Sequence, residues 1–410
     1  MLPTREEALR RLSDFVPRAG RDYAANRNYD RGPAERSNVS TLAPYVRCRL
    51  LTEEEILRAV LERFRPASAT KFVQEIFWRA YWKGWLESRP AVWSDYRRGL
   101  ASRLVEVERD RDLGIEYEAA VGGRTGIDAF DAWARELIET GYLHNHARMW
   151  FASIWIFTLL LPWELGADFF IRHLACGDPA SNTLSWRWVA GLHTQGKTYL
   201  ARASNIRHYT DERFDVGARL RTSAPALRDR AYPSGALPLL DLQPSVEGGA
   251  LLILHDDDAG SESLPLATYD VRASVAVLAA AGRSPQPLGA RAAAFARGAL
   301  VDALSRAAGG GANEPIVAGD DVTAAAMSIA ERADAVQAKV ALTGFAPVGP
   351  VRDALDSLRA PLARRGVSLV EIGRRFDALA WPHATRGYFG LRHKIPEILR
   401  ALDLIDASDA

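Results

Sequence analysis

A proline-rich stretch near the middle of the chain separates two different hydrophobic patterns. Residues 222–248 contain several prolines among glycines and serines, and they show no helical period. Apolar residues recur at helical spacing before this stretch, whereas short apolar runs alternate with helical segments after it. We therefore expect a multidomain α and α/β protein, with a helical domain at 1–221, a linker at 222–248, an α/β domain at 249–380 and a C-terminal helical segment at 381–410.

The first domain is expected to consist of helices. Thr52 followed by Glu55 is the pattern of a capping box, which predicts the start of a helix within 50–64. Further segments with helical apolar spacing are 72–86, 128–138, 144–161 and 169–174. Eight of the eleven tryptophans lie between Trp78 and Trp163, so the aromatic residues are concentrated in this domain.

The second domain is expected to be a Rossmann-like parallel sheet. Apolar runs typical of buried parallel strands occur at 251–254, 275–278, 316–318, 340–342 and 367–369. Helical segments separate them at about 289–306, 322–335 and 350–365, and a helix is predicted over 381–402. Gly309 to Gly311 are predicted to form a loop, which lacks the Gly-Lys-Ser/Thr continuation of a P-loop.

Composition narrows the class of protein. The net charge is +1, which does not suit a protein that coats nucleic acid through bulk charge. The longest apolar stretch, 151–162, is too short to span a membrane, and no signal peptide opens the chain. Cys48 and Cys176 are the only cysteines, so we expect a cytoplasmic protein without a four-cysteine metal site and predict no metal cofactor.

Two blocks carry the strongest chemical signal: Gly141-Tyr-Leu-His-Asn-His-Ala-Arg-Met149 and Gly177-Asp-Pro-Ala-Ser-Asn-Thr-Leu-Ser-Trp-Arg-Trp188. Either block alone is explained by packed helix ends. Together they resemble the FAD-binding domain of photolyases and cryptochromes, whose pattern is Gly-x-x-His-Asn-x-x-Arg-Met, a Trp, and then Asp-x-Asp…Asn-x-x-x-Trp-x-Trp. Similar matches occur at 40–45, 72–79 and 125–132, so the resemblance covers about residues 20–215.

The resemblance implies FAD as cofactor and assigns residues to it by position. Ser40 and Thr41 match residues that hold the FAD phosphates, and Arg79 matches a cofactor-contacting arginine. The positions around the isoalloxazine ring are Asn145, Arg148, Cys176, Asp178 and Asn182. Asn182 falls where the family places the side chain that faces flavin N5, and an amide keeps that site neutral.

The resemblance also implies UV-damaged DNA as partner. Trp78 and Trp188 match the aromatics that hold a flipped pyrimidine dimer, while Glu75, Asn145 and Met149 match its other contacts. The activity implied is that of a deoxyribodipyrimidine photolyase, a lyase that uses blue light for DNA repair. Glu75 would hydrogen-bond the lesion and Asn182 would tune the flavin. The resemblance leaves open whether the lesion is a cyclobutane dimer or a (6-4) product.

Two further tryptophans match the family's electron-transfer chain. Trp186 and Trp163 correspond to its inner and middle members, which photoreduce the flavin. The outer member lies in a segment that does not align. Trp93 and Tyr117 are candidates for it, although a packing role explains each equally well.

Departures from the family pattern leave other functions open. Cys176 stands where the family usually has an aspartate paired with the arginine at Arg148, which should raise the flavin reduction potential. The family usually has other residues at three further positions, which are Ala80, His146 and Asn38-Val39 in this chain. A cryptochrome-like photoreceptor without repair activity is therefore the alternative, and a light-independent flavoprotein is the third.

The C-terminal half resembles an antenna domain in an unusual position. Residues 250–258, with Leu264-Pro265, look like the opening strand and loop of the α/β domain that normally precedes the FAD domain, and 340–369 looks like its later part. We expect a domain permutation that moves the antenna-type domain to the C-terminus. A second antenna chromophore of unidentified kind could bind there, although an unrelated Rossmann-like domain explains the pattern as well. We expect a monomer.

Overall fold

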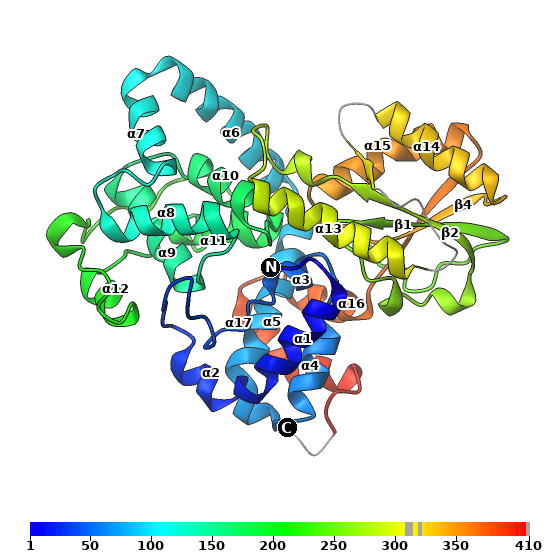
Figure 1. Cartoon of the computed structure of the whole chain (residues 1–410), viewed down its shortest axis with the longest axis horizontal. Coiled ribbons are helices and arrows are strands. Elements are labelled where there is room, and N and C mark those ends of the chain that lie inside the picture. The colour runs from blue at the N-terminus through cyan, green and yellow to red at the C-terminus, as the bar shows by residue number, and fades with distance from the viewer. Residues whose placement is uncertain (308–314, 319–321, 407–410) are drawn as a thin grey trace.

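The computed structural model describes residues 1–307, 315–318 and 322–406 and contains a helical region beside a parallel sheet (Figure 1). Gly309 to Gly311, predicted as a loop, lie outside the described residues. We call residues 1–221 the helical region and residues 249–372 the sheet region. The helices of the helical region are α1 (Arg5–Phe15), α2 (Arg21–Asn26), α3 (Ala43–Arg47), α4 (Glu53–Leu61), α5 (Pro66–Glu87), α6 (Ala91–Arg109), α7 (Arg111–Val121), α8 (Asp128–Thr140), α9 (Asn145–Ser153), α10 (Trp163–His173), α11 (Pro179–Val189) and α12 (Ala203–Tyr209).

The helices predicted before residue 222 are confirmed, with shifted ends. Thr52 caps α4, because its side chain accepts from the Glu55 N–H and the Glu55 carboxylate accepts from the Thr52 N–H at 2.8 Å. α5 starts at Pro66, earlier than predicted, since proline suits the first helical position, where no donor is needed. The helix predicted over 144–161 is shorter: α9 continues as one π-helical turn at Ile154–Thr158, and Pro162 prevents further extension.

The sheet region confirms the predicted parallel strands. Its strands are β1 (Gly249–His255), β2 (Asp270–Leu278), β3 (Ile316–Val317), β4 (Val340–Gly344) and β5 (Ser368–Ile372), in the order β3-β2-β1-β4-β5. Every pairing is parallel. The intervening helices are α13 (Ala290–Arg306), α14 (Val322–Ala335) and α15 (Pro350–Arg364). This doubly wound arrangement has its topological switch point between β1 and β4.

The sheet separates two hydrophobic layers. Leu251 and Ile253 of β1 pack in the core that contains α14 and α15, whereas Leu252 and Leu254 point to the core shared with α13 and the helical region. Side chains alternate along a strand, so β1 contributes to both layers and is buried along its whole length. The sheet is thus packed against the helical region by its α13 side.

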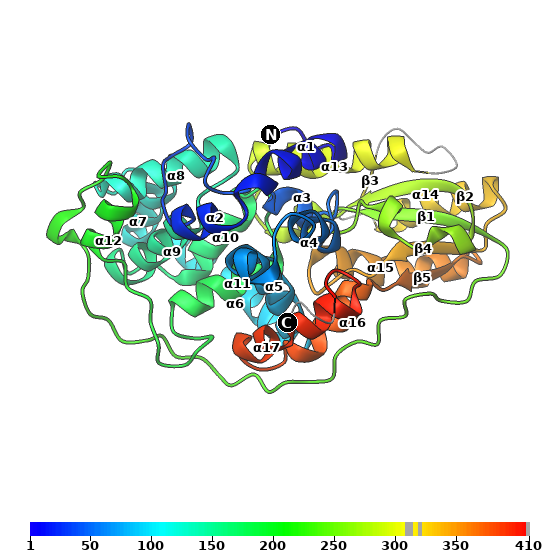
Figure 2. The same ribbon diagram turned by 90° about the horizontal axis from the view of Figure 1, so that it is seen from below.

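The connection between the two regions contains no helix or strand. Residues 222–248 are largely exposed and run along the outside of the molecule (Figure 2). The proposed linker at 222–248 matches this irregular stretch, and the division into domains remains our proposal.

The chain returns to the helical region after β5. α16 (Arg375–Ala380) leads through a 3-10 turn at Trp381–His383 to α17 (Tyr388–Ala401), and these elements pack against α5 (Figure 1). Gly84 permits this close approach, because a Cβ there would lie 2.9 Å from the Trp381 Cα. The helix predicted over 381–402 is confirmed as α17 with a later start, because residues 384–387 break from the preceding 3-10 turn and let the chain change direction.

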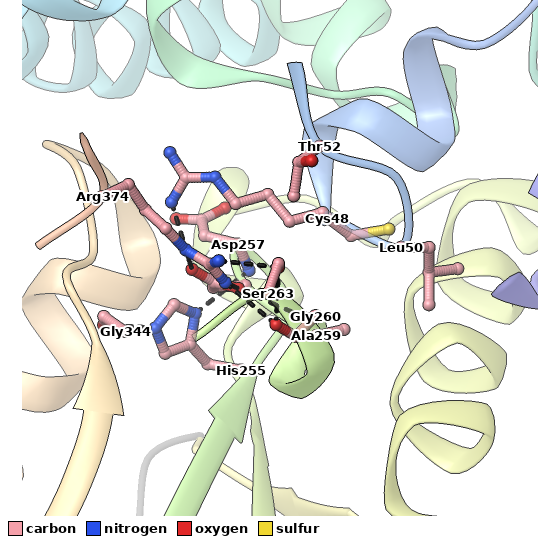
Figure 3. A network of polar contacts seen from close by, with 12 residues as sticks. Cys48, Leu50, Thr52, His255, Asp257, Ala259, Gly260, Ser263, Gly344 and Arg374 are labelled. Atoms are coloured by element: carbon pink, nitrogen blue, oxygen red, sulfur yellow. Dashed lines mark hydrogen bonds and ion pairs between the residues drawn. The ribbon is translucent and has the colours of Figure 1, made fainter. Parts of the chain in front are cut away.

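Buried ion pairs join the two regions at the carboxyl end of β1. Arg47 Nη2 lies 2.6 Å from Asp257 Oδ1, and Arg49 Nη1 lies 3.1 Å from Asp258 Oδ2. Arg374, which follows β5, binds Asp258 Oδ1 at 2.6 Å and donates to Ser263 (Figure 3). Burial opposes ionisation of Asp258, but Arg374 and Arg49 outweigh it and hold the Asp258 pKa well below its usual range. This network occupies the switch point of the sheet.

Candidate functional site

Helix α5 carries three of the predicted site residues on one face. Glu75, Trp78 and Arg79 are spaced i, i+3 and i+4, so they lie on the same side of the helix. α5 packs against α2, α4, α11 and α17. It therefore brings these residues next to α11, which carries Asn182, Trp186 and Trp188.

The residues predicted around the flavin are, as a set, more buried than those predicted around the lesion. We call Arg79, Arg148, Cys176, Asp178 and Asn182 the inner group; its members are buried or half-buried. We call Glu75, Trp78, Asn145, Met149 and Trp188 the outer group; Asn145 is exposed and the other four are half-buried. Asn145 was also predicted to contact the flavin, but its exposure matches the outer group.

Arg79 and Asp178 connect α5 to the start of α11. Arg79 Nη1 lies 3.5 Å from Asp178 Oδ2, and Asp178 caps α11 by accepting from the Ser181 N–H at 2.7 Å. Burial opposes ionisation of Asp178, but Lys83 and Arg79 lower its pKa below the ordinary value. The buried Nη1 of Arg79 makes no hydrogen bond within the described residues. It can therefore donate to an anionic ligand.

Arg148 faces the thiol of Cys176, at a position where the photolyase pattern usually has the carboxylate of an aspartate. Both of its terminal nitrogens lie 3.6 Å from Cys176 Sγ, and its Nε donates to the Leu143 carbonyl at 2.8 Å. A thiol is a weak acceptor without charge. The guanidinium charge is thus left without an anionic partner among the described residues.

Asn182 is held in one orientation by a backbone contact. Its Nδ2 donates to the Ala167 carbonyl of α10 at 2.8 Å. Asn182 lies one turn after Asp178 on α11, so both side chains project from the same part of the helix. This hydrogen bond fixes the amide that would face the flavin.

Ser40 and Thr41 line a cavity of about 630 Å³ between α1, the loop before α3 and α13. Thr41 has a φ of 52° and accepts a hydrogen bond from Arg11 Nη1 at 3.0 Å. The cavity carries further arginines: Arg10, Arg18, Arg36 and Arg291. Hydroxyls beside several guanidinium groups fit a phosphate-containing cofactor. The inner group does not line this cavity, which comes nearest to it at Ala175, next to Cys176.

Glu75 in the outer group is paired with Arg27, the residue that ends α2. Surrounding protein raises the pKa of the Glu75 carboxyl, and Arg27 opposes that shift. Asn145 and Met149 contact each other across one turn of α9, with Asn145 Nδ2 3.8 Å from Met149 Sδ. Arg27 is a site neighbour that sequence reasoning missed, because it is 48 residues away and in no matched motif.

The two aromatic side chains of the outer group have different neighbours. Trp78 stacks on Tyr388 of α17, with ring centroids 3.5 Å apart and an interplanar angle of 9°. Trp188 lies 5.5 Å from the Tyr199 ring. Sequence reasoning also missed Tyr388, which belongs to the far end of the chain and to none of the matched motifs.

The predicted electron-transfer residues fall into two aromatic series. The Trp186 ring lies 6.2 Å from Trp155, which lies 6.2 Å from Tyr117. Trp163 instead lies 5.5 Å from Tyr96, which lies 5.4 Å from Trp93. No ring contact within the described residues joins Trp163 to Trp186. Trp155 is therefore a neighbour of Trp186 that sequence reasoning missed, although it belongs to the same run of tryptophans.

Two structural surveys cover the described part of the chain. It contains no group of three or more His, Cys, Asp or Glu side chains placed to hold a metal ion. None of its helices combines the length and apolar character that a membrane span requires.

Comparison with known proteins identifies the helical region. The model of the FAD binding domain of DNA photolyase matches residues 72–229. The deoxyribodipyrimidine photo-lyase of Streptomyces griseus is 33% identical over 191 residues, which cover 43% of this chain and 40% of that protein. The one from Thermus thermophilus is 32% identical over 250 residues, covering 59% of this chain and 54% of that protein. The chain thus spans about half the length of these curated relatives.

Two solved structures are similar over the same share of the chain. A bacterial class III photolyase from Agrobacterium tumefaciens is 26% identical with a TM-score of 0.43, covering 51% of this chain and 43% of that one. A Synechocystis cryptochrome is 24% identical with a TM-score of 0.41 and the same coverage. The match over residues 72–229 shows that the chain carries the FAD-binding domain of the photolyase/cryptochrome family, and a C-terminal parallel sheet follows this domain.

Proposed function

We propose that this protein is a light-driven photolyase that binds UV-damaged DNA and splits pyrimidine dimers. The observation that carries the proposal is that both groups lie on neighbouring helices, with the inner group as a set more buried than the outer group. The inner group lies within the protein around Arg79 and Asp178, and the outer group retains exposed atoms on α5, α9 and α11. A cofactor enclosed by protein beside an accessible substrate face is the arrangement that this reaction needs.

The residues present fit FAD. Arg79, Arg148, Asp178 and Asn182 would hold its ring system. Ser40 and Thr41, with the arginines of the adjacent cavity, would hold its phosphates. The Nη1 of Arg79 supports this assignment, because it has an ion-pair partner in Asp178 but makes no hydrogen bond within the described residues, and a ligand could supply the acceptor.

The outer group would bind the lesion outside the base stack. Trp78 and Trp188 offer aromatic faces for a flipped dimer, and a damaged base pair costs less to open than a sound one. Asn145 and Met149 lie on the neighbouring turn of α9 and would contact the same dimer.

Glu75 would act on the carbonyl oxygens of the dimer. The chemistry that reduced FAD supplies when bound is a light-driven electron, which returns after the two bonds between the bases have broken, so no net oxidation occurs. Negative charge develops on the thymine carbonyls during that step. Burial raises the pKa of the Glu75 carboxyl and Arg27 opposes that shift, so the pair would bring a carboxyl group and a positive charge to those carbonyls.

The test uses flavin-loaded protein and UV-irradiated oligothymidine under blue light with a reductant. We expect loss of dimers, and Glu75→Ala should slow it by about tenfold or more with unchanged flavin absorbance. Glu62→Ala changes an exposed glutamate at the end of α4 and should leave the rate unchanged. Intact dimers after illumination of the loaded wild-type protein would reject the proposal.

A cryptochrome-like photoreceptor is the alternative, and one observation favours it. Arg148 faces the thiol of Cys176 rather than a carboxylate, which changes the charge beside the flavin and hence its stable redox state. The same assay separates the two functions, because a photoreceptor would show light-dependent flavin spectra without loss of dimers.

Buried polar contacts lie at the usual ligand position of such a sheet, so we do not include an antenna chromophore in the proposal. Ligands of open parallel sheets bind at the switch point, where this protein has the buried ion pairs of Asp258 with Arg49 and Arg374 (Figure 3). His255 closes the same end of the sheet by contacting the Gly344 carbonyl at 2.8 Å. Our proposal therefore uses FAD alone and one copy of the chain.

A further inference from the structure

Helix α17 begins beside the outer group, although it belongs to the opposite end of the chain. Tyr388 begins this helix, stacks on Trp78, and donates through its hydroxyl to the Gln74 carbonyl of α5 at 3.0 Å. Its ring is almost fully buried, at 7% exposure. Leu391 and Ile395 bury the following turns, so Tyr388 is a fixed wall of the site rather than a mobile cover.

The Tyr388 ring covers one face of the Trp78 ring. A stacked partner on one side holds an indole in a single orientation, and only the remaining surface of Trp78 is left for a base. Burial raises the pKa of Tyr388, and Glu75, Arg392 and Arg27 are the charged groups that act on its hydroxyl. Arg392 follows Tyr388 by four residues, so it lies on the same side of α17 one turn further along.

The outer face of the same helix end is basic and carries an exposed aromatic ring. Phe389, Arg392 and His393 are spaced i, i+3 and i+4, and all three are exposed, with Phe389 at 67%. No hydrogen bond or ion pair joins Arg392 to another residue in the described ranges. An unpaired arginine beside an exposed phenylalanine is typical of surfaces that hold single-stranded nucleic acid, where arginines bind phosphates and rings stack on bases.

We propose that the start of α17 completes the DNA site: Tyr388 positions Trp78, and Phe389, Arg392 and His393 contact the strand that carries the lesion. This inference rests on the proposed function and extends it to residues outside the FAD-binding domain. The sheet region is then required for more than packing, because the chain passes through it before α17 returns to α5.

The test measures binding in the dark, so that it is independent of repair. The full-length flavin-loaded protein is titrated against a labelled oligothymidine that carries one cyclobutane dimer, at several salt concentrations. Arg392→Ala should weaken binding about fivefold and reduce the slope of log affinity against log salt by about 0.7, the value for one phosphate contact on a single strand. Phe389→Ala should weaken binding with an unchanged slope.

Arg400→Ala is the matched control, because Arg400 is exposed on the last turn of the same helix, away from Trp78. It should retain wild-type affinity and slope. Equal behaviour of the Arg392 and Arg400 variants would overturn the inference. If that equality occurs in a protein that still repairs dimers, the proposed function stands. A wild-type protein that binds damaged and undamaged strands equally and repairs nothing would reject both.

The positioning role of Tyr388 is tested by the preference for damaged over undamaged DNA, which a purely structural role of this residue would not change. Tyr388→Phe keeps the stack and should retain the preference for damaged over undamaged DNA. Tyr388→Leu removes the stack and should reduce that preference, while the salt slope stays the same. Retained preference in the leucine variant would overturn the positioning role.

Discussion

The Cys176 thiol lies 3.6 Å from both terminal nitrogens of Arg148, inside the group of residues that matches the flavin site. The arginine charge therefore has an uncharged partner. This pairing sets the electrostatic environment of the cofactor ring and gives the first prediction.

Cys176→Asp should lower the reduction potential of the bound flavin. The added carboxylate pairs with Arg148 and disfavours negative charge on the reduced ring. Each 1.4 kcal/mol of unfavourable interaction corresponds to about 30 mV for a two-electron couple. A redox titration followed by flavin absorbance measures the change. Cys176→Ser adds no charge and should keep the wild-type potential; a serine variant that shifts as far as the aspartate variant would contradict the electrostatic explanation.

Removing Asp258 should destabilise the whole protein. Asp258→Ala leaves Arg49 and Arg374 without their buried partner, and breaking such a pair costs about 3–5 kcal/mol. Urea unfolding measures the loss. Asp270→Ala is the control, because Asp270 pairs with Arg272 at the surface and should cost about 1 kcal/mol or less. Similar losses in both variants would mean that the buried network contributes no more than an exposed pair.

Glu87 should make stability fall as pH rises toward neutrality. Burial raises the pKa of this carboxyl at the end of α5 to about 7, while a hydrogen bond from the Val348 N–H and the charge of Arg352 oppose the shift. Asp377 and Lys83 are the other charged groups that act on Glu87. In the unfolded chain the pKa is about 4.3, so the folded state holds the extra proton between the two values.

The direction of this pH dependence follows from the proton count, because the folded state binds more protons than the unfolded chain between the two pKa values. The free energy of unfolding decreases from about pH 4.3 to about pH 7, by about 4 kcal/mol in total, and then levels off with respect to this group. Glu87→Gln should flatten that part of the profile and make the protein more stable than wild type at pH 8. Unfolding in urea at a series of pH values tests this, and parallel profiles for the two proteins would contradict it.

Trp186→Phe should slow light-driven reduction of the flavin without affecting dimer splitting by chemically reduced protein. Because Trp155 is the tryptophan in ring contact with Trp186, Trp155→Phe should slow photoreduction more than Trp163→Phe does. Absorbance during illumination in the presence of an electron donor measures the rates. The reverse order would show that electrons pass through Trp163, as the family pattern implies.

The local features of the fold could be predicted from the sequence, because local chemistry determines them. The capping box at Thr52 marks the start of α4, and α14 occupies the predicted residues 322–335. The π-helical turn after α9 was not predicted, since apolar periodicity continues through it up to Pro162. Backbone hydrogen-bonding pattern, rather than hydrophobic spacing, distinguishes that turn from an α-helix.

The sequence names candidate site residues, but it does not name their neighbours in the fold. Glu75, Trp78 and Arg79 were identified through a short motif, and a short motif describes one face of one helix. The contacts of Trp78 with Tyr388 and of Glu75 with Arg27 depend on how distant helices pack. Single-sequence patterns contain no information on such packing, so these neighbours required the structure.

The packing of α17 on α5 has a consequence for how the protein is made. Residues that complete the hydrophobic surface of α5, among them Tyr388, Leu391 and Ile395, are translated only after the whole sheet region. A nascent chain that has emerged only as far as the linker would expose that surface on the ribosome. The helical half can therefore reach its final state only after synthesis of the C-terminal end, and until then α5 is a site where chaperones would bind.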